Sequence, residues 1–419
     1  MLSETKMIND EYPLTPVPQA RLRHWFSVAA ISALVSLSLP TFLTGIEVGQ
    51  SLSFDQTLAA IYLGSLILTL VGGVSGTLGV KYRLTSYALI QASFGGVGAR
   101  IVNLAFGASL VGWFGVNVDL FSDACIQLLG NESPHSAQIL LIEICAGAIM
   151  TISTLLGFLW INRLSMLFAP VLLVVTAFLM NLWIRGDSDL AYAKISSELS
   201  FSNAVSAVVG AAIIGAVILP DITRYVTQSY GGWMVSIVCY LVIAPPVMLI
   251  AAGAMSHSEA KELLDLMMIS GLGLGAALIV ILGSWVLNSL NLYSAVLSIR
   301  ASVPVTTTSK ATVGLGLLGI CAATLDITSW FIDFLIYLSI GFIPVAAIML
   351  VHFQSRPSTT QRIKGLVLTA KTNNRALLIW AMSMVMAMLE LEFNLSVSGV
   401  LALDLLVFSA LTYAMVRPR

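Results

Sequence analysis

The stretch GLGLGAALIVILGSWVLNSLNLYSAVLS, residues 271–298, is an apolar run long enough to cross a lipid bilayer. Polar and aromatic residues interrupt it near the middle, at Trp285, Asn288, Ser289, Asn291 and Tyr293. An unpaired polar group in hydrocarbon costs several kcal/mol, so the two carboxamides need partners. Asn288 and Asn291 are three residues apart and therefore lie on one face of a helix. Hydrogen bonding between helices is one explanation, and recognition of the edge of a flat, uncharged, polar heterocycle is the other.

The composition excludes a soluble globular protein. Of the 419 residues, 58% are hydrophobic and 10% are charged, and the mean hydropathy is +0.94. A chain of this kind is predicted to be an all-α polytopic membrane protein. The apolar runs indicate about twelve spans, at residues 25–50, 57–80, 99–129, 137–160, 164–184, 202–226, 232–256, 271–299, 311–324, 326–351, 374–391 and 394–416.

The cysteines do not indicate a metal site. Cys125, Cys145, Cys239 and Cys321 lie in or beside apolar runs, without the spacing of metal ligands, and we interpret them as packing residues. The chain contains no Walker sequence, HExxH or GxSxG motif, which argues against an ATPase, a zinc protease or a serine hydrolase. No cofactor is expected, and no nucleic-acid partner.

Basic residues fall in alternate loops, at Lys81, Arg83, Arg163, Arg224 and Arg300 among others. The positive-inside rule then predicts that both termini lie in the cytoplasm. The first ~20 residues are polar and show no cleavable signal peptide. We therefore expect a multi-pass protein of the cytoplasmic (inner) membrane with a polar N-terminal arm at residues 1–24.

Two spans contain signals of a broken helix. Pro40 falls inside SLSLPTFLTG of the first span, and Gly210, Gly215 and Pro220 punctuate GAAIIGAVILP of the sixth. Irregular backbone at membrane depth is tolerated only where it lines a cavity or is buried in protein. Isolated proline kinks are the alternative, but breaks at matching places favour an inverted repeat of five plus five helices with a binding site between them. The predicted parts are residues 25–185 and 186–353 for the two repeats, 354–373 for a cytoplasmic linker, and 374–419 for two further helices and the C-terminal tail.

The third span places an aromatic ring and a carboxamide on one helical face, at Trp113 and Asn117. Carboxylates are also present in or near the spans, and each is a functional candidate because a charge at the bilayer centre costs ~2.5–3.5 kcal/mol. They are Glu47, Asp119, Asp123 and Asp221. Asp123 is expected near the outer surface, and Asp221 is expected to pair with Arg224.

Several blocks resemble the nucleobase:cation symporter-1 family, most closely its bacterial cytosine permeases. They are PVPQ (16–19), GVKYRLT (79–85), SFGGVG (93–98), VGWFGV (111–116), DITR (221–224) and NSLNLYS (288–294). The resemblance implies a LeuT-like fold in which the broken first and sixth helices, with the third and eighth, hold a base. It also implies that Trp113 stacks on the base, that Asn117, Asn288 and Asn291 read its edge, and that backbone groups from Ala212 to Gly215 complete the site.

Departures from the family pattern change these expectations. Ala212 replaces an aromatic residue of the cytosine permeases and Leu110 replaces a glutamine, so the resemblance implies a larger and less polar pocket. Sodium-coupled members use the first span, here Ser38 and Thr41, with two hydroxyls that are here Val286 and Leu287. Because the last two side chains offer no oxygen, a proton is favoured over sodium, with Glu47 as its carrier. Gln91 and His352 also differ from the family pattern, where arginine and aspartate are common, and we have no explanation for them.

The resulting hypothesis is a secondary active symporter that imports a nucleobase or related nitrogenous heterocycle together with a cation. Hydroxymethylpyrimidine or another thiamine precursor, and allantoin or a hydantoin, are alternative substrates. A channel or a membrane sensor on the same scaffold is a second class of function. An enzyme is not expected, because no pair of nucleophile and base or set of metal ligands is evident.

Overall fold

The computed structural model describes residues 16–129, 135–155, 158–186, 199–258, 260, 263–302, 307–325, 327–354, 372–393 and 395–416. All regular elements in these ranges are helical, which confirms the predicted all-α class. By length and composition, eight helical stretches among the described residues can cross a membrane. The long helices are α2 (Trp25–Ser36), α3 (Leu39–Ser51), α4 (Phe54–Tyr82), α5 (Ser86–Leu128), α6 (Ser136–Leu155), α7 (Phe158–Arg185), α8 (Phe201–Val217), α11 (Ala244–Ser256), α13 (Leu274–Ser302), α14 (Thr308–Ala323), α15 (Phe331–Gln354), α17 (Asn374–Phe393) and α18 (Leu401–Val416).

Shorter segments join these helices. They are η1 (Gln19–Arg21), α9 (Pro220–Thr223), α10 (Gly231–Ser236), α12 (Leu263–Met267) and η5 (Ile327–Trp330), with π-helical turns at η3 (Ile237–Ile243) and η4 (Met268–Leu272). The segment η3 joins α10 to α11, so these three form one continuous stretch of helix.

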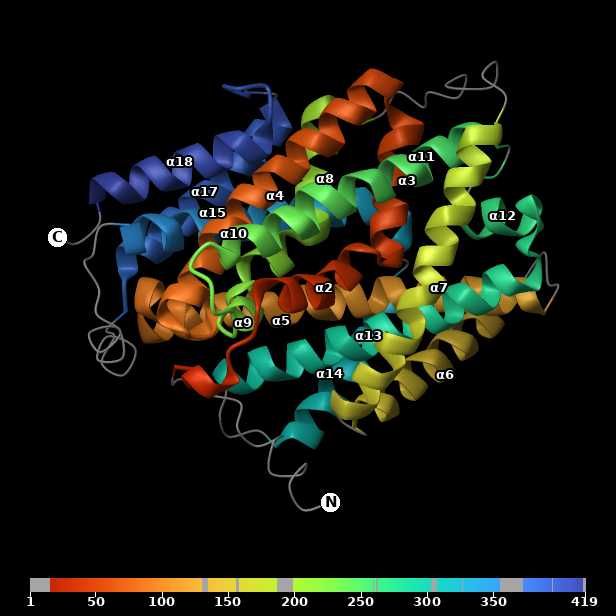
Figure 1. The fold of residues 1–419 in the computed structure, drawn as a ribbon, viewed down its shortest axis with the longest axis horizontal. Helices are drawn as coiled ribbons and strands as arrows, with labels where there is room; N and C mark the ends of the chain where they lie inside the picture. The colour runs from red at the N-terminus through yellow and green to blue at the C-terminus, as the bar shows by residue number, and fades with distance from the viewer. Residues whose placement is uncertain are drawn as a thin grey trace.

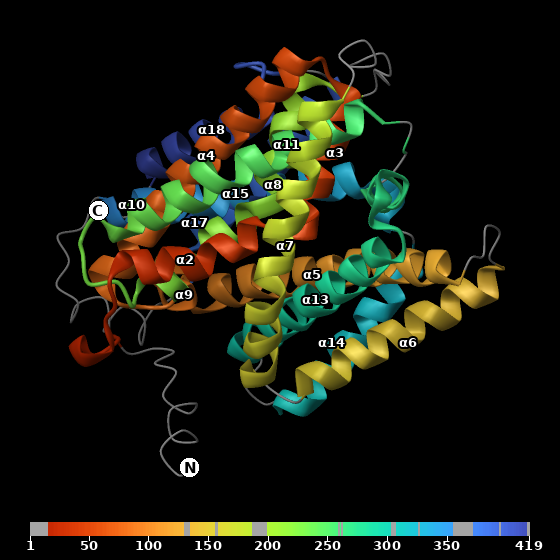
Figure 2. The same ribbon diagram turned by 45° about the vertical axis from the view of Figure 1, so that its right-hand side comes forward.

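The helices pack in two groups. One contains α5, α6, α13 and α14, and the other contains α4, α8, α10, α11 and α15. Figures 1 and 2 show the first group together on one side of the molecule, with α5 and α13 side by side over much of their length. Helices α17 and α18 pack together against α15, on the outside of the second group.

The first span is interrupted at Leu37 and Ser38, between α2 and α3. Ser38 has extended backbone angles, φ −84° and ψ 159°, and directly precedes α3. Pro40 lies in the first turn of α3, where a backbone N–H has no partner within the helix and its loss costs little. Helix α2 ends at Ser36, the residue four before Pro40 whose carbonyl the proline ring would meet in a continuous helix. The predicted break in the first span is therefore confirmed, and it lies directly before the proline.

The sixth span is interrupted between α8, which ends at Val217, and α9, which begins at Pro220. Gly210 and Gly215 lie inside α8 and do not break it, which corrects the prediction for those two residues. Gly210 has a packing role instead, because a Cβ atom there would clash with the Leu335 carbonyl of α15. The glycine thus allows the backbones of α8 and α15 to touch.

The break in the sixth span leaves a backbone carbonyl that another helix satisfies. In a continuous helix the N–H of residue 220 would bond to the Ala216 oxygen, but Pro220 has no N–H. The Ser75 hydroxyl of α4 donates to this oxygen at 2.5 Å. Beyond the break, the Thr223 hydroxyl of α9 donates to the carbonyl of Gly76, the residue after Ser75 on α4, at 2.9 Å. Helix α4 therefore closes the hydrogen bonding of the break.

Three predicted boundaries move. The third span begins at Ser86 rather than at residue 99 and is kinked at Gly95, where φ is 77°. The eighth helix begins at Leu274, because Gly271 and Gly273 have φ of 104° and 53° and turn the chain before it. The last helix begins at Leu401 rather than at residue 394.

A carboxylate explains the late start of α18. Asp404, in its first turn, accepts hydrogen bonds from the N–H groups of Val397 and Ser398 and from the Ser396 hydroxyl. These bonds hold the preceding residues in a turn rather than a helix.

The end of the N-terminal arm lies against the segment that follows α9. Arg23 and Val226 form a single β-bridge, and the Trp25 N–H donates to the Gln228 side chain at 3.0 Å.

Residues 1–15 and nearly all of the predicted linker 354–373 lie outside the described residues. The two repeats, 25–185 and 186–353, and the boundaries of the C-terminal part stay predictions.

Replacing Ser75 by alanine is expected to destabilise the protein by about 1–3 kcal/mol, since the Ala216 carbonyl would then be buried without a donor. Thermal unfolding of the purified protein in detergent measures the loss. Thr77→Val is the matched control, because the Thr77 hydroxyl donates to Gly73 of its own helix, whose carbonyl keeps its backbone donor. An unchanged unfolding temperature in Ser75→Ala would contradict the role given to Ser75.

Candidate functional site

Trp113 lies on α5 and is only 6% exposed, so its ring faces protein rather than lipid. Two aromatic rings at the start of α15 meet it nearly edge-on. The ring centroids of Phe334 and Phe331 lie 5.3 and 6.0 Å from that of Trp113, at interplanar angles of 76° and 75°. Edge-on neighbours position the indole and leave the plane of its ring system available for stacking.

Asn117 and Asn288 are both completely buried. The Asn117 amide nitrogen donates to the Trp113 carbonyl at 2.7 Å, one turn back on α5. The Asn288 amide nitrogen crosses from α13 to donate to the Phe114 carbonyl at 2.9 Å, and it also contacts the Met150 sulfur at 3.0 Å. The structure therefore brings Asn117 and Asn288 to neighbouring carbonyls of α5, beside the tryptophan.

Asn291 is half-buried one turn further along α13 and makes no hydrogen bond within the part of the chain that the structure describes. Ala212 and Gly215 are half-buried on α8, where a Cβ atom at Gly215 would lie 3.2 Å from the Tyr240 hydroxyl. Ala212 lies inside α8, whereas Gly215 is in the last turn of α8, where the carbonyls have no partner within the helix. The role of the backbone groups from Ala212 to Gly215 stays a prediction. The break offers irregular backbone three residues later, at Ile218 and Leu219.

A cavity of about 800 Å³ lies next to the tryptophan cluster. Phe331 belongs to both, because it lines the cavity and contacts the Trp113 ring. Four carboxylates line the cavity, and no lysine, arginine or histidine is among its described lining residues. The carboxylates come from α3, α5 and α6 and are Glu47, Asp119, Asp123 and Glu143.

The candidate cation-coupling residues divide between two places. Glu47 is half-buried and lines the cavity, whereas Ser38 and Thr41 lie at the break of the first span with their hydroxyls 3.3 Å apart. Val286 is buried on α13, where the sodium-coupled pattern would need an oxygen. Within the described ranges, no group of three or more acidic, histidine or cysteine side chains is placed to hold a metal ion.

Asp221 has a structural role. Its carboxylate accepts hydrogen bonds from the backbone N–H and the hydroxyl of Ser86, at 2.7 and 2.8 Å, and so caps the start of α5. Arg224 Nε donates to the Asp221 backbone carbonyl at 3.1 Å. The sequence suggested Arg224 as the partner of this carboxylate, but it gave no indication of Ser86.

Three residues near the tryptophan were missed in the sequence. Phe331 and Phe334 stand at the start of a predicted span, where aromatic residues are common and carry no specific signal. Glu143 lies in the apolar run ILLIEICAGA, and the signal that singled out Glu47 would have found it.

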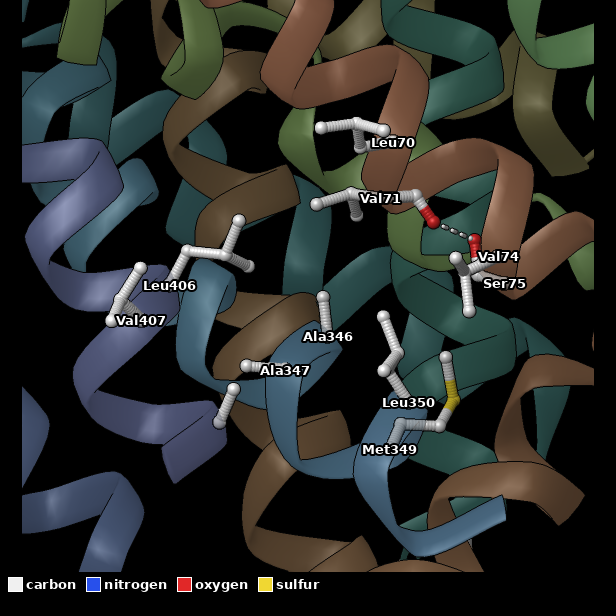
Figure 3. Close-up of a pocket in the computed structure, with 11 residues that line it drawn as sticks. Leu70, Val71, Val74, Ser75, Ala346, Ala347, Met349, Leu350, Leu406 and Val407 are labelled. Carbon is white, nitrogen blue, oxygen red and sulfur yellow. Dashed lines mark hydrogen bonds between the residues drawn. The ribbon is translucent and has the colours of Figure 1, made fainter. Parts of the chain in front are cut away.

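A second cavity, of about 330 Å³, lies among α4, α15 and α18. Figure 3 shows its walls, which are apolar side chains except for Ser75, the residue whose hydroxyl bonds to Ala216 at the break in the sixth span. The lining offers no set of polar groups that could orient a heterocycle, so we do not regard it as the substrate site.

Comparison with known proteins gives consistent results. A family model described as permeases for cytosine/purines, uracil, thiamine and allantoin matches residues 16–411. The cytosine permeases of Escherichia coli O157:H7 and Escherichia coli strain K12 are each 25% identical over 342 residues, which are 81% of this chain and 80% of theirs.

Solved structures show the same fold. An inward-facing conformation of Mhp1 superposes with a TM-score of 0.80 at 18% identity, covering 96% of this chain and 92% of that one. A second structure of Mhp1 is described as a nucleobase-cation-symport-1 family transporter in a closed conformation with bromovinylhydantoin bound. It superposes with a TM-score of 0.74 at 19% identity, covering 96% of this chain and 93% of that one. A sodium-coupled sialic acid symporter gives 0.59 at 12% identity, with coverages of 95% and 88%.

Asn288→Ala is expected to lower the free energy of unfolding by about 0.5–1.5 kcal/mol, because the hydrogen bond that joins α13 to the Phe114 carbonyl of α5 is lost while that carbonyl keeps its backbone donor within α5. Asn291→Ala is the matched control, since the same residue type is removed one turn away without breaking a hydrogen bond to the described residues. Thermal unfolding of both variants in detergent gives the comparison. Equal losses would show that the bond between the helices does not distinguish Asn288.

Proposed function

The chain belongs to the family of permeases for cytosine/purines, uracil, thiamine and allantoin, and from this premise we propose that it is a symporter for a nitrogenous heterocycle. The family placement confirms the resemblance found in the sequence and makes the protein a multi-pass membrane transporter rather than an enzyme. The substrate, the coupling ion and the route are the proposed parts.

The observation that carries the proposal is a buried indole with two buried amides attached beside it. A planar ring can stack on Trp113, and aromatic stacking of a base contributes ~1–3 kcal/mol. The amides of Asn117 and Asn288 donate to the backbone carbonyls of Trp113 and Phe114 on α5. From there they can form hydrogen bonds with the edge of that ring. Neither Trp113 nor the two amides faces lipid.

Transport would proceed by alternating access, with about twelve spans of which ten form a five-plus-five inverted repeat. The two packed groups supply the moving parts, because α5 and α13 carry the amides and α8 belongs to the other group. Rocking of one group against the other would open the site to each side of the membrane in turn. Both termini would lie in the cytoplasm, and the membrane would be the cytoplasmic (inner) one.

The coupling ion is proposed to be a proton. Glu47 lines the cavity beside the site, and it lies on α3, which follows the break in the first span. Ser38 and Thr41 offer oxygens, but Val286 and Leu287 offer none to complete a sodium site of the family type. A carboxylate that takes up and releases a proton as the cavity changes sides would couple the two fluxes.

A bulkier substrate than cytosine is the second candidate, and Leu110 and Ala212 favour it. Leu110 is a buried aliphatic residue one turn before Trp113, and Ala212 is small. The space and reduced polarity suit hydroxymethylpyrimidine, another thiamine precursor, allantoin or a hydantoin. A channel or sensor on this scaffold would not accumulate substrate against its gradient, so concentrative uptake into energised vesicles separates these classes.

Trp113→Ala is expected to weaken heterocycle binding by about tenfold to a hundredfold, which corresponds to the loss of one stacked ring. Calorimetry with the tightest binder from a panel of bases, hydroxymethylpyrimidine and allantoin measures the change. Trp380→Ala is the control, because Trp380 is also buried but bonds to Gly341 between α17 and α15. Equal affinities of the wild type and Trp113→Ala for this heterocycle would show that the substrate does not stack on Trp113.

Glu47→Gln is expected to abolish accumulation driven by an inward proton gradient while exchange of labelled for unlabelled substrate continues, because the amide cannot carry a proton. Uptake and exchange in proteoliposomes give the two rates. Glu390→Gln is the control, since Glu390 is a buried carboxylate on α17 that does not line the cavity. Retained accumulation in Glu47→Gln, with wild-type uptake equal in acidic and alkaline matched buffers, would contradict proton coupling through Glu47.

A further inference from the structure

The smaller cavity, of about 330 Å³, lies between the middle parts of membrane helices α4, α15 and α18. On α18, Val407 lies six residues after the start of the helix at Leu401, and Ala410 lies six residues before its end at Val416. Both are therefore about 9 Å from the nearer end of the helix. The hydrocarbon core of a bilayer is about 30 Å thick, so lipid acyl chains surround the protein at this depth.

The cavity is open toward this hydrocarbon on one side and closed by the helix bundle on the other. Leu70 of α4 and Val407 of α18 line it and are 43% and 52% exposed, so it reaches the outer surface of the helices. Ser75 also lines it but is only 1% exposed, which places Ser75 at the inner end. In the view of Figure 3, Val407 and Ser75 stand on opposite sides of the cavity, with Ala346 and Ala347 of α15 between them.

The lining is apolar apart from one hydroxyl. All the other described lining residues are leucine, valine, alanine or methionine. The Ser75 hydroxyl has a single hydrogen, and it lies 2.5 Å from the Ala216 carbonyl and 2.8 Å from the Val71 carbonyl. It therefore has no hydrogen to spare for a polar ligand. Aliphatic cavities of this kind take apolar molecules, and one of about 150 Å³ is enough to hold benzene.

Small side chains keep the space between the helices open. Ala346 and Ala347 of α15 and Ala410 of α18 each bring a single methyl group to the lining. The atoms around an empty cavity lose dispersion contacts, so an occupant of the right chemistry is favoured. The apolar molecules present at this depth are the acyl chains of the bilayer.

We propose that this cavity binds an acyl chain of a membrane phospholipid, which enters where Leu70 and Val407 are exposed and extends as far as Ser75. The headgroup stays at the membrane surface, because the lining has no charged group to receive it. This lipid site is separate from the proposed heterocycle site and does not depend on the identity of the transported substrate. A second copy of the chain is the alternative occupant, but it would have to insert a side chain between three helices, whereas hydrocarbon surrounds every copy.

An acyl chain in this position would support the break in the sixth span. It would contact Ser75 from the cavity side and exclude water that would compete for the hydroxyl. Hydrogen bonds are stronger in apolar surroundings, so the bond to Ala216 gains from the occupant. In addition, α4 and α15 both pack on α8, and the occupant would hold these two helices at their present spacing.

A phospholipid with a photoreactive diazirine in the middle of one acyl chain tests the site, in proteoliposomes of the full-length protein. Met349 lines the cavity and Ile348, its neighbour on α15, does not, although both are buried. Label on Met349 is expected to exceed label on Ile348 by about tenfold, because close packing keeps lipid from Ile348. Ile152 of α6, which is exposed, reports labelling by bulk lipid.

Variants that fill the cavity should remove this label. Ala410→Phe and Ala346→Leu fill it from two different helices, and each should lower the label on Met349 by about tenfold while the label on Ile152 stays constant. Ala414→Phe is the matched control, because Ala414 is an exposed alanine one turn further along α18 that does not line the cavity. Added phospholipid should also raise the unfolding temperature of the wild type in detergent more than that of Ala410→Phe.

The wild type alone can overturn the proposal, so the test does not depend on the folding of the variants. Equal label on Met349 and Ile348 would show that no acyl chain enters. Label on Met349 that persists in both filled variants would show that it comes from elsewhere. Absent label together with cross-linking of two copies through a cysteine at Val407 would assign the cavity to a second copy instead.

Discussion

The carbonyl of Ala216 is the group on which this architecture depends. Pro220 removes the donor that a continuous helix would supply, and the low dielectric of the membrane interior makes an unpaired carbonyl costly. The Ser75 hydroxyl lies 2.5 Å from this carbonyl and 2.8 Å from the Val71 carbonyl of its own helix, so α4 supplies a donor that the break itself lacks. Thr223 and Asp221 extend the same arrangement to Gly76 of α4 and to Ser86 at the start of α5. An interruption that could be a weak point is thereby tied to both helix groups.

The amides of the third and eighth spans show that the structural and the functional explanation of a buried asparagine can both hold. The sequence offered hydrogen bonding between helices and recognition of a ligand as alternatives for Asn288. The side chain has two ends, and the NH₂ end joins α13 to the Phe114 carbonyl of α5 while the oxygen end stays available. Anchoring one end also restricts rotation of the other, which is the preorganisation that a selective binding site requires.

Much of the fold could be predicted from the sequence, because apolar runs of span length have few alternatives in a membrane protein. The errors have physical causes. Gly210 and Gly215 were expected to interrupt the sixth span, but both lie inside α8, and Gly210 instead allows a backbone contact with Leu335. The start of the third span at Ser86 was missed because that helix begins in a polar segment and bends at Gly95.

The site was less accessible to sequence analysis, because its geometry depends on distant pairs. The partners Asn288 and Phe114 are 174 residues apart, and no local pattern shows which end of an amide is used. Helical spacing placed Trp113 and Asn117 on one face and the family resemblance supplied their expected roles, but Phe331 and Phe334 carry no sequence signal for their contact with the indole. The sequence showed isolated carboxylates in separate spans, but it did not indicate that they line one cavity.

The position of Phe331 connects α8, the first half of the sixth span, to the rings that contact Trp113. Gly210 brings the backbone of α8 against Leu335, and Leu335 lies one turn from Phe331 on α15. Because close backbone contact leaves little room for sliding, a displacement of α8 must carry the start of α15 with it. Phe331, which lines the acidic cavity and contacts Trp113, would therefore move with α8, whereas the indole would move with α5. Relative movement of the two helix groups would change the contacts of both Phe331 and Phe334 with Trp113, so the packing of α8 against α15 would influence how the indole is covered.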